Sequence, residues 1–503
     1  MFDSDFEKGR YHPLILPEYN VPLTIDGLRE IFSSCSDFEV REIAFGLEKN
    51  VRLNVCWLDG IVSGSEVSSS VLRPLTQSAR AGSARDEAQA LAAVLCGAVY
   101  SCSVKQCTAM DETVSALTHG HCAVIFDTLQ TALCFEVRSE NTRAISEPTL
   151  EKALKGAKDS FVETLRTNTA LVRRRICTPK LKLIESTVGR KSGTRVAVMF
   201  IDGVAAPETV KELAARLDAL DIDALLGVGV LEEGIVDAPS SPFPQLIHTE
   251  RPDRFSMYLM DGRVGLLVDG IPVGLVLPVT FAEFMKVTGD ANLHYLVSSV
   301  TAAVRYFSLA LSALLPAFYV AIAMYHQEMI PSRLLLSIIE AKQDVPFSTA
   351  LEVIGMLVAF TLLQEAGLRL PNPIGDTVSI IGALIVGQSA VEARVTSPIA
   401  IIVVALSGIA GYTLPSQDMG SAVRLVRFVL VLAAIAAGLF GVAAASCLIV
   451  FWLARMDSFG TSYTAPLSEA SPGSLSRLLL RKPKTQDKYR DPLLKTPDRR
   501  RQK

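Results

Sequence analysis

Residues 428–454 read FVLVLAAIAAGLFGVAAASCLIVFWLA, a run of 27 residues without a charged side chain. Arg427 and Arg455 stand at its two ends, and Trp452 lies close to the second end. A helix needs about 20 mostly apolar residues to cross the ~30 Å hydrocarbon core of a bilayer, and flanking cations with an interfacial tryptophan are typical of anchored spans. The run therefore predicts a transmembrane helix.

Two further charge-free runs are long enough to span a bilayer, Phe307–Tyr325 with 19 residues and Val395–Gln417 with 23. Two apolar segments are shorter, Val353–Leu363 and Thr377–Val391. These two are marginal helices, re-entrant pieces or buried helices packed among stronger neighbours. We expect an all-α multi-pass transmembrane domain over residues 301–456.

The charges outside this domain predict its topology. Residues 477–503 hold eleven Lys and Arg against three Asp, so the positive-inside tendency places this basic tail, residues 457–503, in the cytoplasm. The extension 1–23 carries acidic residues and prolines instead of a basic and then apolar signal peptide, so the N-terminus is also expected in the cytoplasm. An even number of crossings follows, and we expect four, with a disordered tail.

Polar side chains gather around the two weak segments. A charge at mid-bilayer costs about 2.5 to 3.5 kcal/mol on insertion scales, so such groups usually face a partner, a cavity or a pathway. The alternative is that they lie in short loops at the level of the lipid headgroups. The candidates for an intramembrane polar site are Glu352, Gln388, Glu392 and Arg394.

The half of the chain before residue 300 is internally repeated at an offset near 142 residues. Asp59 and Asp202, which are 143 positions apart, each close an apolar stretch with an Asp-Gly pair. Asp127 and Asp269, which are 142 positions apart, each follow a later apolar stretch. Each copy therefore has an early strand leading into a helix and a late hairpin. We expect two related α/β subdomains, residues 24–145 and 146–300.

The sequence contains no complete catalytic or nucleotide-binding motif. It lacks a G-x-x-x-x-G-K-[ST] phosphate loop and a G-x-S-x-G nucleophile elbow, and GVGVLEEG at 227–234 misses the dinucleotide-binding spacing. A net charge of -3 and the absence of a long basic run before the tail argue against nucleic-acid binding. We expect a protein that is not an enzyme and that holds no cofactor.

Cysteine, histidine and arginine patterns give weaker signals. The nine cysteines form no C-x-x-C pair and are interpreted as reduced thiols, the nearest pair being Cys102 and Cys107. His119 and His121 lie in a predicted turn, where a metal site is the less favoured interpretation. The cluster 173–175, three successive arginines, could meet lipid headgroups or a partner, and a solvated face is an equal alternative.

A series of short motifs resembles the A subunits of GerA-type spore germination receptors. FVETLRTN at 161–168 and LVRRRI at 171–176 follow the family pattern F-x-E-x-x-x-x-N-x-x-L-x-R-x-R-I. The resemblance extends from about residue 37 to residue 452 and keeps the motifs in order. The others are FPQ 243–245, ERPD 250–253, GR 262–263, VDGIP 268–272, LPAFYVA 315–321, VPF 345–347, QEAGLRLP 364–371 and GALIVGQ 382–388.

The motifs nominate a set of residues with structural roles. The chain departs from the family at Gly156-Ala157, where Gly-Pro is usual, and at 289–292, where GDAN replaces an acidic, tyrosine-rich segment. The nominated residues are Glu163, Asn168, Arg173, Arg175, Arg251, Pro252, Asp253, Asp269, Gly270, Pro272, Pro316, Glu365, Gly367 and Pro371.

The resemblance implies a membrane subunit of a nutrient-sensing receptor in the inner membrane of a bacterial spore. Its partners would be a transporter-like B subunit, a lipoprotein C subunit, further copies of itself and membrane lipid. It would contribute to the ion release that triggers germination, and the four candidate polar residues would lie near the ion path. The alternatives are a stand-alone transporter, a sporulation-associated paralogue that does not sense nutrients, and, least favoured, a membrane-anchored enzyme.

Overall fold

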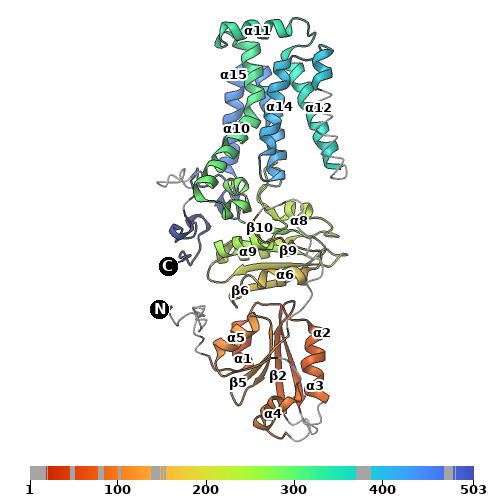
Figure 1. The fold of residues 1–503 in the computed structure, drawn as a ribbon, viewed down its shortest axis with the longest axis vertical. Helices are drawn as coiled ribbons and strands as arrows, with labels where there is room; N and C mark the ends of the chain where they lie inside the picture. The colour runs from red at the N-terminus through yellow and green to blue at the C-terminus, as the bar shows by residue number, and fades with distance from the viewer. Residues whose placement is uncertain are drawn as a thin grey trace, which may run out of the picture. The chain divides into compact units, whose positions relative to one another are not determined.

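A computed structural model describes residues 19, 21–45, 51–77, 84–99, 103–137, 148, 151, 155–369, 387–468, 480, 481 and 483–502. The chain forms two compact units. We call residues 1–235, 248–277 and 489–503 the α/β unit, and residues 236–247 and 278–488 the helical unit. The predicted fold class, α/β subdomains followed by an all-α membrane domain, is confirmed (Figure 1).

The first half of the α/β unit, lobe 1, is a five-stranded sheet in the order β1-β2-β4-β5-β3. Its strand β2 alternates its side chains, so that Val55 and Trp57 pack against the helices on one face while Cys56 and Leu58 pack against those on the other. Figure 1 shows helices on both faces of this sheet. The elements are α1 (Ile25–Ile31), β1 (Phe38–Phe45), β2 (Val51–Leu58), α2 (Gly64–Val67), η1 (Ser68–Leu72), α3 (Arg73–Gln77), α4 (Glu87–Ala93), η3 (Val94–Ala98), β3 (Val104–Cys107), α5 (Met110–Thr118), β4 (His121–Phe126) and β5 (Thr131–Glu136).

The second half, lobe 2, repeats this topology with the order β6-β7-β9-β10-β8. Because the strand orders correspond position by position, the internal repeat predicted from the sequence is confirmed. The elements are α6 (Leu165–Arg173), β6 (Leu181–Val188), β7 (Thr194–Ile201), α7 (Pro207–Ala219), α8 (Val228–Ile235), β8 (Ile247–Thr249), α9 (Pro252–Asp261), β9 (Val264–Val268) and β10 (Gly274–Leu277).

The repeated aspartates Asp127 and Asp269 have the same structural role in the two lobes. Asp127 Oδ1 accepts a hydrogen bond from the backbone amide of Ile25, the first residue of α1, at 2.7 Å. Asp269 Oδ1 accepts one from the amide of Leu165, the first residue of α6, at 3.1 Å. A carboxylate is favourable at a helix N-terminus because the first amides lack backbone partners. Each aspartate therefore ties the late hairpin of its lobe to the first helix.

A buried ion pair joins the two lobes. Arg173 at the end of α6 donates to both carboxylate oxygens of Asp37, which precedes β1, at 2.6 and 2.7 Å. Both side chains are almost completely buried, and Arg173 also donates to the carbonyl of Leu181 at the start of β6. Next to this pair, the backbone around Ser36 bonds to Leu183 and extends the edge of the second sheet. Arg173 is therefore unavailable to lipid headgroups and to solvent. For this residue, contact with lipid headgroups and a solvated face are both wrong interpretations.

Replacing Arg173 by methionine is expected to loosen this joint, because removing one partner of a buried pair costs about 3 to 5 kcal/mol. Amide hydrogen exchange in residues 34–37 and 181–185 should accelerate by about a hundredfold or more. The double change Arg173→Met with Asp37→Leu should recover most of the protection. The control is Arg190→Met in lobe 2, which breaks an exposed pair with Asp221 and should change exchange little. Equal acceleration in the two single variants would contradict the role of Arg173.

The helical unit packs its apolar side chains between α10, α12, α14 and α15. Among the described residues, three helices are long and apolar enough to cross a membrane, namely Tyr295–Tyr325, Thr349–Gly367 and Gln417–Arg455. Short helical turns precede and follow the first of them. The elements are η4 (Phe281–Met285), η5 (Thr288–Asn292), α10 (Tyr295–Tyr325), η6 (Gln327–Met329), α11 (Ser332–Lys342), α12 (Thr349–Arg369), α14 (Pro398–Tyr412) and α15 (Gln417–Arg455).

Helix α15 folds back on itself in the middle of the charge-free run. Its backbone leaves helical geometry at Ala437 and at Gly438, where φ is 59° and ψ is -140°. A Cβ on Gly441 would lie 2.1 Å from the carbonyl oxygen of Ala433, eight residues earlier, whereas such residues are about 12 Å apart along a helix. The helix therefore has two antiparallel legs, 417–436 and 439–455, and the run 428–454 that was predicted as one span is divided between them. The expected four crossings counted this run once, and the number stays a prediction because residues 370–386 lie outside the described residues.

The other predicted spans differ in length from the helices. Val353–Leu363 lies inside the 21-residue α12, which also contains Glu352 and Glu365 on either side of it. Val395–Gln417 contains only the 15-residue α14, whose start is fixed by the Ser397 hydroxyl accepting from the Ala400 amide. Of Thr377–Val391, residues 377–386 lie outside the described residues, and 387–392 are helical.

The basic tail is not disordered where the structure describes it. Strands β11 (Asp457–Ser458) and β12 (Thr461–Ser462) form a small hairpin next to Tyr463, whose buried hydroxyl donates to the carbonyl of Pro244 at 2.9 Å. Residues 489–501 fold around the turn η8 (Pro492–Leu494) and pack on lobe 2, where Arg490 donates to the carbonyl of Met260 at the end of α9. The expectation of disorder is wrong here because buried apolar side chains and satisfied helix-end carbonyls order the basic sequence. A further turn is η7 (Lys484–Gln486).

Candidate intramembrane polar site

Glu352 is the predicted polar residue that the structure buries most completely. It lies in the first turn of α12, and its carboxylate has no exposed surface. Oε1 is 3.2 Å from Nζ of Lys342 at the end of α11, and Oε2 accepts from the backbone amide of Ser397 at 2.9 Å. Since Ser397 is the N-cap of α14, Glu352 joins three segments of the helical unit. The buried hydroxyl of Tyr319 on α10 lies within electrostatic reach of the same carboxylate.

The other three predicted residues do not share this environment. Gln388 and Glu392 are exposed and lie four residues apart on the short helical segment 387–392. Arg394 follows that segment with φ of 57°, and its guanidinium forms an exposed ion pair with Asp344 at 3.0 Å. The four candidates therefore divide into one buried carboxylate and three exposed groups. The headgroup-level alternative fits the exposed groups, whereas Glu352 has the burial expected of an intramembrane site.

Replacing Glu352 by glutamine should keep an acceptor for the Ser397 amide but leave Lys342 without its counter-charge. Lys342 is 23% exposed, so water screens part of the loss, and we expect about 1 to 3 kcal/mol of destabilisation. Thermal unfolding of the purified chain in detergent measures this change. Asp344→Asn is the matched control, because it breaks an exposed pair worth about 0 to 1 kcal/mol. If the two variants unfold at the same temperature, Glu352 does not stabilise the helical unit as described.

Arg427 is a second buried charge, and its place beside a charge-free run predicted an anchor at the end of a span. It lies instead inside the first leg of α15, ten residues before the fold-back, and is only 1% exposed. Its guanidinium donates to the Ser407 hydroxyl on α14 at 2.8 Å, and Ser407 donates to the carbonyl of Ser312 on α10 at 3.4 Å. Nε has no partner among the described residues. The sequence signal that could have identified Arg427 as buried is the pair of serines, Ser407 and Ser312, within the apolar helices that face it.

Since Arg427 donates to one hydroxyl and has no carboxylate partner among the described residues, removing its charge should stabilise the helical unit. We expect Arg427→Met to raise the free energy of unfolding by about 1 to 3 kcal/mol, because the variant no longer buries a cation at mid-bilayer. Arg424→Met is the control, because Arg424 lies one turn earlier and donates to Gln364 of α12. That variant should be neutral or slightly destabilised in the same thermal assay. A larger loss of stability in Arg427→Met than in Arg424→Met would contradict this description.

Most of the residues nominated by motifs make structural contacts in lobe 2. The Asn168 side chain bonds to both the amide and the carbonyl of Val162, and Arg175 pairs with Asp159. Arg251 donates twice to Asp253, at 3.0 and 2.7 Å. Pro252 occupies the first position of α9, where its missing N–H costs nothing. The Glu163 carbonyl accepts from the amide of Gly270, whose φ of 84° suits glycine.

Motif residues of the helical unit are less uniformly buried. Pro316 lies inside α10 and is buried. Glu365 is exposed on α12 and Gly367 lies near its end. Pro371 lies outside the described residues, and Pro272 belongs to the turn between β9 and β10. The structure thus gives these residues packing or turn positions and does not gather them into one site.

The chain departs from the family pattern at residues 289–292, just before α10, and this junction is held by an ion pair. Arg305 of α10 donates to both carboxylate oxygens of Asp290 at 2.6 Å. Arg481 from the tail donates to the carbonyl of the same residue. Bidentate arginine–carboxylate pairs are geometrically specific. The segment is therefore fixed to the start of the first membrane helix, without the tyrosines of the usual family sequence.

At the other departure, Gly156-Ala157, the Ala157 carbonyl accepts from Arg251 at 3.0 Å. This contact uses only a backbone group. It therefore does not require the proline that is usual at this position.

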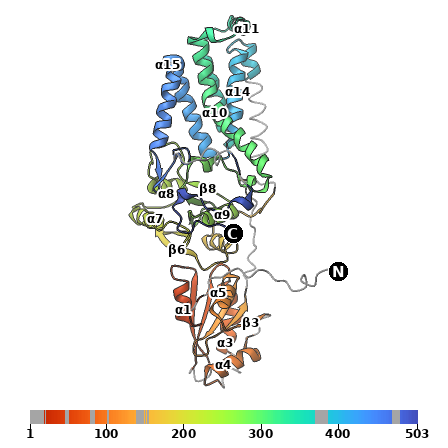
Figure 2. The same cartoon turned by 90° about the vertical axis from the view of Figure 1, so that its left-hand side faces the viewer.

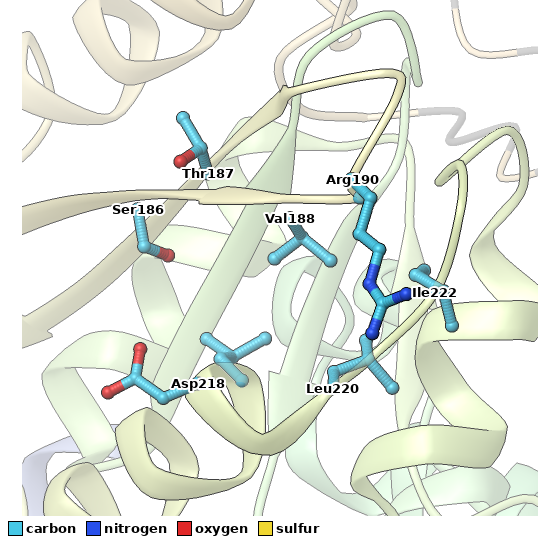
Figure 3. Close-up of a pocket in the computed structure, with 9 residues that line it drawn as sticks. Ser186, Thr187, Val188, Arg190, Asp218, Leu220 and Ile222 are labelled. Carbon is cyan, nitrogen blue, oxygen red and sulfur yellow. The ribbon is translucent and has the colours of Figure 1, made fainter.

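A hollow of about 290 Å³ lies at the end of β6 in the α/β unit. In Figure 3 Arg190 extends toward Leu220 and Ile222, while Asp218 lies on the other side of the hollow. Arg190 is exposed and pairs with Asp221 at the protein surface. The hollow therefore gives no sign of a built ligand site.

Two thiols and two imidazoles of the α/β unit are buried or bonded to the backbone. Burial raises the pKa of the Cys56 and Cys122 thiols, so both remain protonated and unreactive at neutral pH. His119 and His121 each bond through Nδ1 to a backbone carbonyl of α5. Among the described residues no group of three His, Cys, Asp or Glu could hold a metal. Cys102 lies outside the described residues.

Two tandem α/β lobes joined to a helical unit with membrane-spanning helices define a membrane protein with a folded, repeated domain. The family model described as Bacillus/Clostridium GerA spore germination protein matches residues 26–493. The chain therefore belongs to the GerA family of spore germination proteins, the family of A subunits that its motifs resemble.

Relatives match over most of their length. The chain is 34% identical over 464 residues to the uncharacterized membrane protein YfkQ of Bacillus subtilis (strain 168), covering 92% of this chain and 89% of that protein. It is 33% identical over 474 residues to spore germination protein KA of the same strain, covering 94% and 86%. It is 32% identical over 471 residues to spore germination protein GerLA of Bacillus cereus, covering 94% and 95%.

A solved structure also matches. It is the N-terminal domain of the A subunit of the Bacillus megaterium spore germinant receptor GerK3, with 27% identity and a TM-score of 0.40. The match covers 51% of this chain and 94% of that one.

Proposed function

We propose that this chain is the A subunit of a nutrient-sensing germinant receptor and contributes to the ion release that starts spore germination. The observation that carries the proposal is the family match over residues 26–493, together with relatives named as spore germination proteins over nearly their whole length. The chain would act in the inner membrane of the spore, with further copies of itself, a transporter-like B subunit and a lipoprotein C subunit.

The helical unit supports this proposal through its buried polar groups. Glu352 with Lys342, and Arg427 with Ser407, occupy positions inside the helix packing where apolar residues would cost less. Intramembrane ionisable residues usually mark ion or substrate pathways. In our proposal the ion path lies near the end of the unit where Glu352, Gln388, Glu392 and Arg394 are found.

The α/β unit would serve assembly or gating. Three ionisable side chains of the lobes have structural roles: Asp127 and Asp269 hold helix ends, and Arg173 joins the two lobes. The tail segment 489–501 packs on lobe 2, which supports an α/β unit and a C-terminus on the same, cytoplasmic side of the membrane. We propose no catalytic role for either lobe.

A sporulation-associated paralogue that does not itself sense nutrients is the second candidate. The chain is similar to YfkQ, whose name assigns it no role in germination. This similarity supports the paralogue as a second candidate. The two candidates differ in whether a nutrient response depends on the protein.

Deleting the gene should slow or abolish germination of spores on at least one nutrient, while vegetative growth stays unchanged. Loss of refractility under the microscope, with ion release into the medium, measures the response nutrient by nutrient. Restoring the gene should restore the response, which controls for effects on neighbouring genes. Spores that germinate normally on every nutrient, alone and in mixtures, would rule out the receptor role and favour the paralogue.

A further inference from the structure

Helix α11 is too short to cross a bilayer and lies between two helices that are long enough to do so. Its 11 residues extend about 16 Å, roughly half the hydrocarbon thickness. It connects the end of α10 at Tyr325 to the start of α12 at Thr349. Figures 1 and 2 both show it lying across the end of the helix bundle. Because both neighbours end at one membrane surface, α11 is confined to that surface.

The apolar side of α11 is wider than the bundle can cover. Ile338 is buried against the bundle at 8% exposure, but Leu334, Leu336 and Ile339 are 52%, 66% and 55% exposed. At about 100° per residue, Leu334 and Ile339 lie on opposite flanks of Ile338, about 140° apart. Arg333, Ser337 and Glu340 are exposed on the side away from Ile338, with Leu336 at the edge of that side. Such a distribution is typical of helices that lie in a membrane interface.

The segments next to α11 continue the same pattern. Met329 before it and Phe347 after it are exposed apolar side chains. Glu328 and Asp344 are charged and exposed close to them, which indicates the level of the lipid headgroups. The Lys342–Glu352 pair anchors the C-terminal end of α11 to the helix packing. The helix is thus held at a fixed depth, with its apolar flanks uncovered.

We propose that α11 is an interfacial membrane helix whose exposed apolar side chains are covered by lipid. A single protein partner would cover one flank, whereas the exposed residues lie on both sides of the buried one. Lipid surrounds the end of the bundle and reaches both flanks at once. This assignment concerns the membrane contact of the chain and does not depend on the proposed receptor function.

Cysteine labelling of the full chain in lipid vesicles tests the proposal. Ile339→Cys and Leu334→Cys probe the two apolar flanks, and Ser337→Cys is the matched control on the polar side of the same helix. A membrane-impermeant maleimide is added, and mass spectrometry of the peptide that contains each site excludes signal from the native cysteines. We expect both apolar sites to react at least about tenfold more slowly than Ser337→Cys in vesicles of the purified chain alone.

Three outcomes would overturn the proposal. Equal rates at all three sites would place the apolar flanks in water. Protection of Ile339→Cys with fast reaction of Leu334→Cys would indicate a protein surface, such as a second copy, on one flank. Protection that arises only after other receptor subunits are added would assign the surface to those partners.

Discussion

A bilayer offers no water to a charged side chain, so each buried charge of the helical unit needs a partner within the protein. Glu352 meets this constraint with Lys342 from α11 and the Ser397 amide at the start of α14. The contact joins the end of α11 to the beginnings of α12 and α14. The end of α11 and the N-cap of α14 are therefore both held by this one carboxylate at the start of α12.

The α/β unit uses carboxylates in a related way, at helix ends and at the joint between lobes. Asp127 and Asp269 hold corresponding helices by corresponding hydrogen bonds, so the repeat is preserved in its stabilising contacts as well as its strand order. The Arg173–Asp37 pair then joins the two copies. Arg173 and Asp37 occupy positions that are not equivalent in the two lobes. The pair is therefore a contact between the copies and is not repeated within each copy.

Much of the fold could be predicted from the sequence. The Asp-Gly spacings predicted two lobes, because strand ends and tight hairpins have strong local signals. The fold-back of α15 could not be predicted, since an alanine-rich run with Gly438 and Gly441 has the same hydropathy as one long helix. Glu352 was predicted to be costly and was found buried, but its partner Lys342 is ten residues away in another helix. The burial of Arg427 was not predicted, because hydropathy treats an arginine next to an apolar run as the end of the span.

Ion flux in a reconstituted membrane tests the central claim most directly. The chain and its proposed B and C partners would be placed in vesicles, and monovalent cation release would be measured after nutrient is added. Our account predicts nutrient-dependent release that is absent from vesicles holding the partners without this chain. Release at the same rate in the absence of this chain would contradict a contribution of its helical unit to the ion path.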